Sequence, residues 1–253
     1  MKTFLQNRKR VFFALGLIFF LLCWVLISKL IASDLIFPGP MPVFRKLIEL
    51  VRTGELFVPL MKTFVKALLG MLLALGVGLV SGFIMGSSPY FYELVKPLAM
   101  ALRSVPIVSW LSTVILLWGI GWKGPTFIVF ISLLPLIMFN VAEGVRSVDS
   151  KLLEVARVYE VSKWRVFKDV YLGSVLPFLL SSIDVSIGVM WKSAIVAEYL
   201  VGDSGLGVQI SWSKFYIDTP RVFAYTITAV VCGLTLEGVF SLMQRRVYST
   251  WRM

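Results

Sequence analysis

Long apolar runs alternate with short polar segments along most of the chain. Six of these runs are long enough to cross the ~30 Å hydrocarbon layer of a bilayer as helices. They cover roughly residues 11–32, 64–86, 98–119, 125–143, 176–200 and 221–243. The pattern therefore predicts an all-α, polytopic membrane protein with about six transmembrane helices.

One segment outside these runs is amphipathic. After a proline-rich break at residues 38–42, apolar side chains recur at Val43, Leu47, Leu50 and Val51. This spacing places them on one face of a helix, so we expect a helix that lies on the membrane surface.

The composition agrees with a membrane protein and narrows its chemistry. Hydrophobic residues make up 58% of the chain and charged residues only 15%, whereas a soluble domain has roughly a quarter of its residues charged. The net charge of +11 is explained by cationic loops facing an anionic leaflet, so no nucleic acid is expected as a partner. The chain has no histidine, and Cys23 and Cys232 have no metal-type spacing, so we expect neither a metal site nor a cofactor in this chain.

The placement of Lys and Arg residues predicts the topology. The run after Arg8-Lys9-Arg10 is about twice the length of a signal-peptide core, so it is interpreted as a retained first span. The positive-inside bias places both termini in the cytoplasm, although Lys62 and Lys66 fall on the outer side. We therefore expect one transmembrane domain over residues 1–253, with a cytoplasmic N-terminus (1–10), an outer amphipathic segment (33–63), a cytoplasmic loop between spans four and five (146–175) and an outer loop (201–220).

The cytoplasmic loop is charged and helix-prone, unlike its flanks. Asp149 and Ser150 are suitable N-cap residues for a first short helix, and Ser162 for a second. Apolar side chains fall on one face of each helix, at Leu152, Val155 and Tyr159 and then at Trp164, Phe167 and Tyr171, before Pro177 starts the next span. Two such helices form a knob that fits a groove in another protein. The same pattern also describes a solvated loop that merely joins two spans.

This loop resembles the EAA loop of binding-protein-dependent ABC transporter permeases. The matching pieces are Glu154-Val155-Ala156-Arg157, Ser162-Lys163-Trp164-Arg165 and Val175-Leu176-Pro177. Pieces that look like the nitrate/sulfonate/taurine branch of these permeases follow one another elsewhere, at residues 102–106, 118–121, 143–149, 191–192, 196–198, 204–207 and 216–220. The resemblance covers nearly the whole chain.

The resemblance implies a transport subunit, not an enzyme, in a prokaryotic inner membrane. In that family the loop is a coupling helix, docked in a groove of a cytoplasmic ATPase subunit that holds the ATP and Mg²⁺. The positions that the resemblance assigns to coupling are Glu154, Ala156, Arg157, Tyr159, Glu160, Ser162 and Trp164. The expected partners are two ATPase subunits, an extracytoplasmic solute-binding protein, a second permease copy in a homodimer, and membrane lipid.

The loop departs from the family pattern at two positions. Glu160 stands where the family has a glycine, and Gly173 where it has a proline. Glycine adopts a positive φ at a helix end without penalty, whereas another residue costs on the order of 1 kcal/mol. We therefore expect the loop to turn differently, or the first helix to run on without a break.

Ionisable residues inside the apolar runs are candidates for a solute pathway, because charge in hydrocarbon is costly. Asp184, Gly188 and Lys192 share one face of the fifth predicted span, and Glu237 lies in the sixth. The candidate pathway residues are Ser181, Asp184, Gly188, Trp191, Lys192 and Glu198. Lys192 favours a small anion as the solute, unless it snorkels outward or pairs with Glu198, and Asp184 argues against an anion.

The glycine-rich stretch 202–207 invites comparison with a phosphate-binding loop. It lacks the Gly-Lys-Ser/Thr ending and a preceding strand, so a turn or a re-entrant gate segment is the better interpretation. The candidate gate residues are Ser204, Gly205, Leu206 and Gly207.

The sequence leaves three alternatives to a permease for an anion. A passive channel or secondary transporter would need no ATPase subunit. An intramembrane enzyme would need catalytic motifs that the sequence lacks. Within the importer class, related permeases carry heterocyclic vitamin precursors, such as a thiamine pyrimidine or a riboflavin-like compound, instead of an anion.

Overall fold

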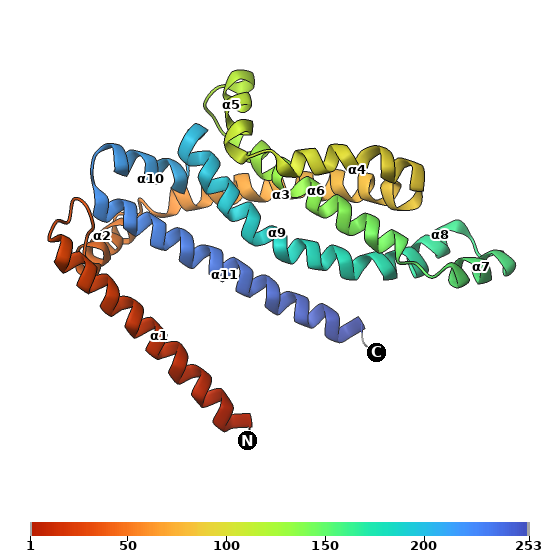
Figure 1. The fold of residues 1–253 in the computed structure, drawn as a ribbon, viewed down its shortest axis with the longest axis horizontal. Coiled ribbons are helices and arrows are strands. Elements are labelled where there is room, and N and C mark those ends of the chain that lie inside the picture. The colour runs from red at the N-terminus through yellow and green to blue at the C-terminus, as the bar shows by residue number, and fades with distance from the viewer. Residues whose placement is uncertain (1, 252–253) are drawn as a thin grey trace. The chain divides into compact units, whose positions relative to one another are not determined.

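The computed structural model describes the backbone of residues 2–251 and the side-chain surroundings of residues 11–244 apart from Phe13. This part of the chain is all-helical and contains no strand. The elements are α1 (Lys2–Ile31), α2 (Pro40–Arg52), α3 (Phe57–Ser87), α4 (Pro89–Ser104), α5 (Ile107–Trp118), α6 (Lys123–Arg146), α7 (Ser150–Val158), α8 (Lys163–Arg165), the π-helix η1 (Val166–Tyr171), α9 (Leu172–Val201), α10 (Leu206–Phe215) and α11 (Thr219–Trp251) (Figure 1). Five helical stretches in the described residues are long and apolar enough to span a membrane, or up to six with one bent pair. The predicted fold class is confirmed.

The third predicted span is not a continuous helix. The run expected over 98–119 is divided between α4 and α5, whose axes are bent by 93° relative to each other. Val105 is extended, with φ −69° and ψ 124°. It precedes Pro106, whose ring disfavours the α conformation in the residue before it. The proline thus explains the break.

The chain forms two compact units, one of residues 1–58 and 209–229 and one of residues 59–208 and 230–253. In the first unit, α2 buries Val43 and Leu50, two of the residues that the amphipathic pattern placed on one face. The indole of Trp24 donates a hydrogen bond to the carbonyl of Pro38 (3.0 Å) and stacks on Phe223. The predicted amphipathic helix is present, and its position at the membrane surface stays a prediction.

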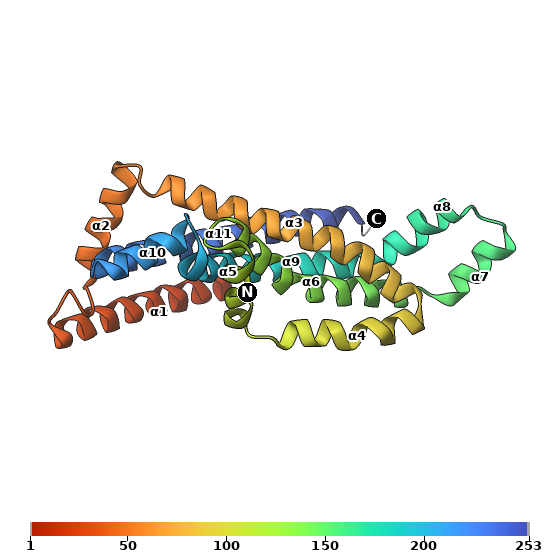
Figure 2. The same cartoon turned by 90° about the horizontal axis from the view of Figure 1, so that it is seen from above.

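In the second unit, α6 packs against α3 and α9 (Figure 2). Four glycines of α3, spaced by four or eight residues, lie directly on α6: Gly70, Gly78, Gly82 and Gly86. A Cβ atom on Gly78 would lie 2.8 Å from Cγ2 of Ile137, too close for a side chain to fit. Gly76 faces open space instead. Small residues therefore allow the two helix backbones to approach closely, as is typical of membrane helices.

Candidate functional site

The charged loop projects beyond the ends of the neighbouring helices α3, α6 and α9 (Figure 1; Figure 2). Its first helix, α7, begins as predicted, because the carboxylate of Asp149 accepts a hydrogen bond from the backbone N–H of Lys151 (2.9 Å). No residue of α7, α8 or η1 is buried. Val158, Tyr159 and Trp164 are 79%, 77% and 71% exposed. An apolar surface of this kind suits a protein partner.

The polar positions assigned to coupling lie on the same surface. Glu154, Arg157, Glu160 and Ser162 are exposed, and Ala156 is half-buried. Among the described residues, none of the four charged or polar side chains forms a salt bridge or a side-chain hydrogen bond. These side chains are thus free to meet a partner.

Glu160 shows how the loop compensates for its missing glycine. It adopts φ +50°, the left-handed conformation that glycine favours. The N–H of Glu160 donates to the carbonyl of Arg157 (3.2 Å), and the N–H of Val161 to that of Ala156 (2.8 Å). These two bonds are those of a Schellman motif, the common end of a helix. The expectation that the first helix runs on is wrong, because α7 ends at Val158 in a turn of the kind that glycine commonly makes.

The second loop helix does not stop before the next span. Helix α8 starts after Ser162, whose side chain makes no capping hydrogen bond, and it continues through η1 into α9. Pro177 lies inside α9 and not at its start, which corrects the predicted boundary. Gly173 lies in the first turn of α9 with open space around it. The second half of the charged loop and the following span therefore form one continuous helical path from Lys163 to Val201.

The predicted polar face of α9 is present. Ser181, Asp184 and Lys192 are exposed, and Gly188 between them is half-buried. The carboxylate of Glu237 on α11 stands against Gly188, where an added Cβ would lie 2.5 Å from Oε1. Among the described side chains, no carboxylate lies within salt-bridge distance of Lys192. The face is thus available to a solute, and its role in transport stays a prediction.

Two candidate pathway residues lie in the protein interior instead. Trp191 is buried, and its indole lies against Gly233 of α11, where an added Cβ would be 2.9 Å from Cδ1. Glu198 is only 1% exposed and pairs with Lys66, not with Lys192. The alternative in which Lys192 pairs with Glu198 is therefore wrong, because Glu198 is buried against Lys66 whereas Lys192 is exposed.

Glu198 belongs to a buried polar cluster between α3 and α9. Nζ of Lys66 lies 3.1 Å from Oε1 of Glu198 and 3.3 Å from Oδ1 of Asp203, and also contacts the carbonyl and hydroxyl oxygens of Ser204. The hydroxyl of Thr63 donates to the other oxygen of Glu198 (2.7 Å). Both partners of the central pair are buried, Lys66 being 4% exposed.

The glycine-rich loop 202–207 closes over this cluster and leads into α10. The N–H of Gly207 donates to Glu198 (3.2 Å), and that of Leu206 donates to the hydroxyl of Thr63 (2.8 Å). Gly205 has φ +114° and lies against the Glu198 carboxylate, so no side chain fits there. Burial alone would raise the pKa of the Asp203 carboxyl, but hydrogen bonding to Ser204 and the Lys66 ammonium lower it. The loop is a turn. The backbone groups of Ser204, Leu206 and Gly207 hold it against α3 and α9 by hydrogen bonds, and Gly205 fits against the Glu198 carboxylate.

Sequence reasoning missed Lys66, which it had counted among the outer loop cations. Thr63, Lys66 and Gly70 are spaced by three and four residues and so share one helix face. All three are buried. The shared face of Lys66 and the tightly packed Gly70 was the signal in the sequence. It indicates that Lys66 faces the protein interior and therefore needs a carboxylate partner.

Comparison with known proteins identifies the family. The family described as "Binding-protein-dependent transport system inner membrane component" matches residues 74–249, more than half of the chain. The chain belongs to this family of ABC transporter permeases. It is 31% identical to the putative aliphatic sulfonates transport permease SsuC of Bacillus subtilis, over 90% of this chain and 83% of that protein. It is 22% identical to the nitrate import permease NrtB of Synechocystis, over 96% of this chain and 88% of that protein.

Solved structures agree on the fold of the permease. A bacterial alginate ABC transporter, in complex with an alginate-bound periplasmic protein, contains a chain that matches with a TM-score of 0.63. The match covers 96% of this permease and 97% of that chain at 13% identity, so it shows the fold alone. The resemblance stated from the sequence is confirmed: the protein is an ABC importer permease of the nitrate/sulfonate/taurine type, an inner-membrane transport subunit.

Proposed function

We propose that this permease forms the membrane pathway for a small anion in an importer powered by separate ATPase subunits. The relatives support the solute class, because SsuC is described as a transport permease for aliphatic sulfonates and NrtB as one for nitrate. Two ATPase subunits bind ATP and Mg²⁺ on the cytoplasmic side, a binding protein delivers the solute, and two permease copies enclose the pathway.

The observation that carries the coupling role is the exposed apolar face of α7 and α8. Leu152 and Val155 of α7 and Tyr159 directly after it repeat at three and four residues, and all three side chains are exposed although η1 packs beside α7. An amphipathic helix of this kind binds by laying its apolar face into a groove. Charged residues around that face, Glu154 and Arg157 among them, fix the orientation of the partner.

The continuous helix from α8 to α9 supplies the transmission. Because no flexible break separates Lys163 from Val201, a displacement of the loop by a closing ATPase pair moves α9 directly. The polar face with Asp184 and Lys192 moves with it. Alternating access in this proposal is therefore a tilt of α9, driven by ATP binding and reset by hydrolysis.

The polar face of α9 gives the solute its environment. An anion that leaves water needs a compensating donor or positive charge, and Lys192 offers an ammonium with three donors. Ser181 offers a hydroxyl further along the face. Asp184 and Glu237 are exposed on this side as well, and these carboxylates favour the second candidate, a cationic or heterocyclic solute such as a vitamin precursor.

The test of the proposal is ATP-dependent uptake by the reconstituted complex. Glu154→Lys should leave the permease in the membrane but reduce co-purification of the ATPase and uptake together. Glu93→Lys, a charge reversal at an exposed position of α4, is the matched control and should leave both unchanged. Uptake that needs no ATPase subunit would show a passive channel or a secondary transporter instead. Competition by nitrate, sulfonates and thiamine-like pyrimidines then separates the two solute classes.

A further inference from the structure

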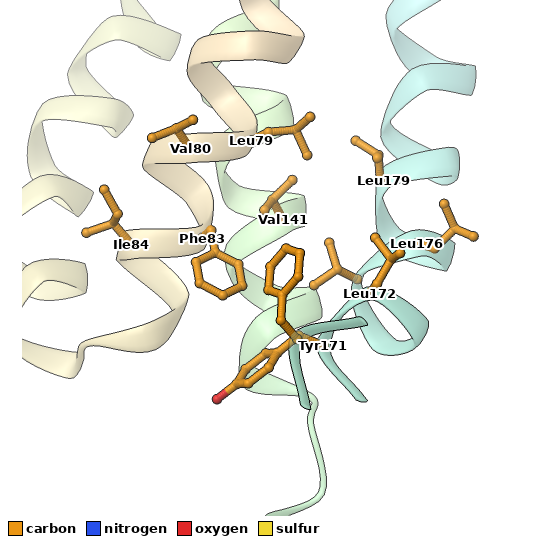
Figure 3. A pocket seen from close by; sticks show the side chains of 11 residues that line it. Leu79, Val80, Phe83, Ile84, Val141, Tyr171, Leu172, Leu176 and Leu179 are labelled. Carbon is orange, nitrogen blue, oxygen red and sulfur yellow. The ribbon is translucent and has the colours of Figure 1, made fainter. Parts of the chain in front are cut away.

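A cavity of about 440 Å³ lies between α3, α6 and the junction of η1 with α9 (Figure 3). Its walls include Val80 and Phe83 from α3, Val141 from α6, and Tyr171, Leu172 and Leu179 from the junction. These residues lie near the ends of α3 and α6, at the last residue of η1 and near the start of α9. The cavity is therefore at the same end of this unit as the coupling loop.

The chemistry of the cavity selects an apolar occupant. Eleven side chains line it, and Tyr171 is the one among them that carries a polar atom. Figure 3 shows its hydroxyl directed away from the other lining side chains. The cavity therefore offers no donor or acceptor to an anionic solute, and apolar cavities of this kind do not hold water. In a membrane-spanning chain, the available apolar occupant is hydrocarbon.

The segment beside the cavity carries a net positive charge. Lys163, Arg165 and Lys168 are exposed within nine residues of Tyr171, and Asp169 is the one carboxylate among them. Trp164 stacks on Phe167, a lining residue, at 5.9 Å and remains exposed. Exposed tryptophan and cationic side chains next to an apolar wall are the arrangement found where a protein meets lipid head groups.

We propose that this cavity binds one acyl chain of an anionic phospholipid, whose head group contacts the cations of residues 163–168. The acyl chain moves from one hydrocarbon environment to another, so it contributes little preference between lipids. The preference comes from the head group, because each cationic side chain favours an anionic lipid by roughly five-fold. The proposal rests on the membrane location of the chain and not on the identity of its solute.

The cavity is placed to influence coupling. The rings of Phe167 and Tyr171 both contact Phe83, each with ring centroids 5.5 Å apart, and so join η1 to α3. Phe167 and Tyr171 are four residues apart in η1, and both of their rings lie against the one ring of Phe83. An acyl chain against Tyr171 and Leu172 fills the space behind these contacts and so braces the junction through which the loop moves α9.

The experiment uses the intact permease–ATPase complex in vesicles that contain trace phosphatidylglycerol or phosphatidylcholine with a photoreactive acyl chain. Peptide mass spectrometry after illumination should find label on residues 79–84 and 167–179, several-fold more from phosphatidylglycerol. Val80→Trp fills the cavity and should remove most of that label. Val77→Trp, on the same helix but outside the lining, is the control and should keep it.

Charge variants test the head group separately from the cavity. Lys168→Gln should reduce the preference for phosphatidylglycerol by roughly five-fold without changing labelling by phosphatidylcholine. Lys151→Gln, an exposed cation of α7, should change neither. Absence of label from both lipids, or equal labelling by both that Lys168→Gln leaves unchanged, would overturn the proposal. Photo-crosslinks from a reactive residue at position 80 to a second permease copy would show that a protein helix occupies the cavity instead.

Discussion

Lys66 of α3 and Glu198 of α9, 132 residues apart in sequence, form a buried ion pair of 3.1 Å between two helices. Each charge is stable there only because the other is present, since an unpaired charge in a protein interior is heavily penalised. The remaining oxygen of Glu198 and the remaining protons of Lys66 are satisfied by Thr63, Gly207 and Ser204. The pair therefore fixes the glycine-rich turn to two spans at once.

Removal of one partner should destabilise the permease strongly. Lys66→Met leaves Glu198 without its counter-ion and is expected to lower the free energy of unfolding by about 3–5 kcal/mol. Lys62→Met, at an exposed position one turn earlier, should cost less than about 0.5 kcal/mol. Unfolding in mixed detergent–SDS micelles measures both. The double variant Lys66→Met/Glu198→Gln should regain part of the loss, and a purely additive result would show that the two residues are not coupled.

Asp203 gives this cluster a predictable response to acid. Its pKa lies below the ordinary value of about 3.9, so the carboxylate is favoured in the folded state. Its contribution is fully present above the ordinary pKa and is lost as the pH falls through the lowered one. Asp203→Asn should therefore speed hydrogen exchange of the amides of residues 202–207 between pH 5 and 8. An exchange rate equal to that of the wild-type loop would contradict the assignment.

The glycines of α3 allow a matched comparison within one helix. Gly82→Val places a side chain against Val141 and the carbonyl of Met138, where an added Cβ would lie at 2.8 and 2.7 Å. Overpacking of this kind costs about 1–3 kcal/mol. Gly76→Val points into open space and should be neutral or slightly stabilising. Thermal melting of the purified protein distinguishes the two, and equal effects would mean that α3 and α6 are not in close contact.

Much of the fold follows from the sequence because membrane spans depend on length and hydropathy, which are local properties. The N-cap at Asp149 and the amphipathic face of α2 were predicted for the same reason. The bend at Val105 required attention to one proline within an otherwise apolar run. The burial of Lys66 was missed because it depends on a carboxylate 132 residues away, and no local pattern reports such a pairing. The positive φ of Glu160 was likewise unexpected, since the Schellman hydrogen bonds outweigh a local penalty of about 1 kcal/mol.

Glu160→Gly should stabilise the coupling loop, because glycine adopts the observed φ of +50° without strain. The expected gain is about 1 kcal/mol, with little change in the contact surface, since Glu160 is exposed at the end of α7. Glu160→Ala keeps the strain and should show no gain. Hydrogen exchange of residues 157–162 measures the local effect. An ATPase contact that weakens in both variants would show that the carboxylate itself meets the partner.

Lys192 tests the charge of the solute most directly. It is exposed on α9 without a described carboxylate in salt-bridge distance, so its ammonium is free to attract an anion that has shed water. In a symmetric pair of permeases, two such lysines would raise the positive potential of one pathway while binding weakly enough for release. Lys192→Met should reduce uptake of an anion about ten-fold or more, and Lys192→Arg should retain most of it because the charge and donors persist.

Asp184→Asn removes a carboxylate from the same face of α9. It should leave anion uptake unchanged or raise it, whereas it should reduce uptake of a cationic heterocycle. Solute-stimulated ATP hydrolysis and uptake, measured together in proteoliposomes, separate these outcomes from a loss of assembly. Full uptake by Lys192→Met would leave this lysine as a residue that extends to the membrane surface, and the anion proposal would then lose its support in the structure.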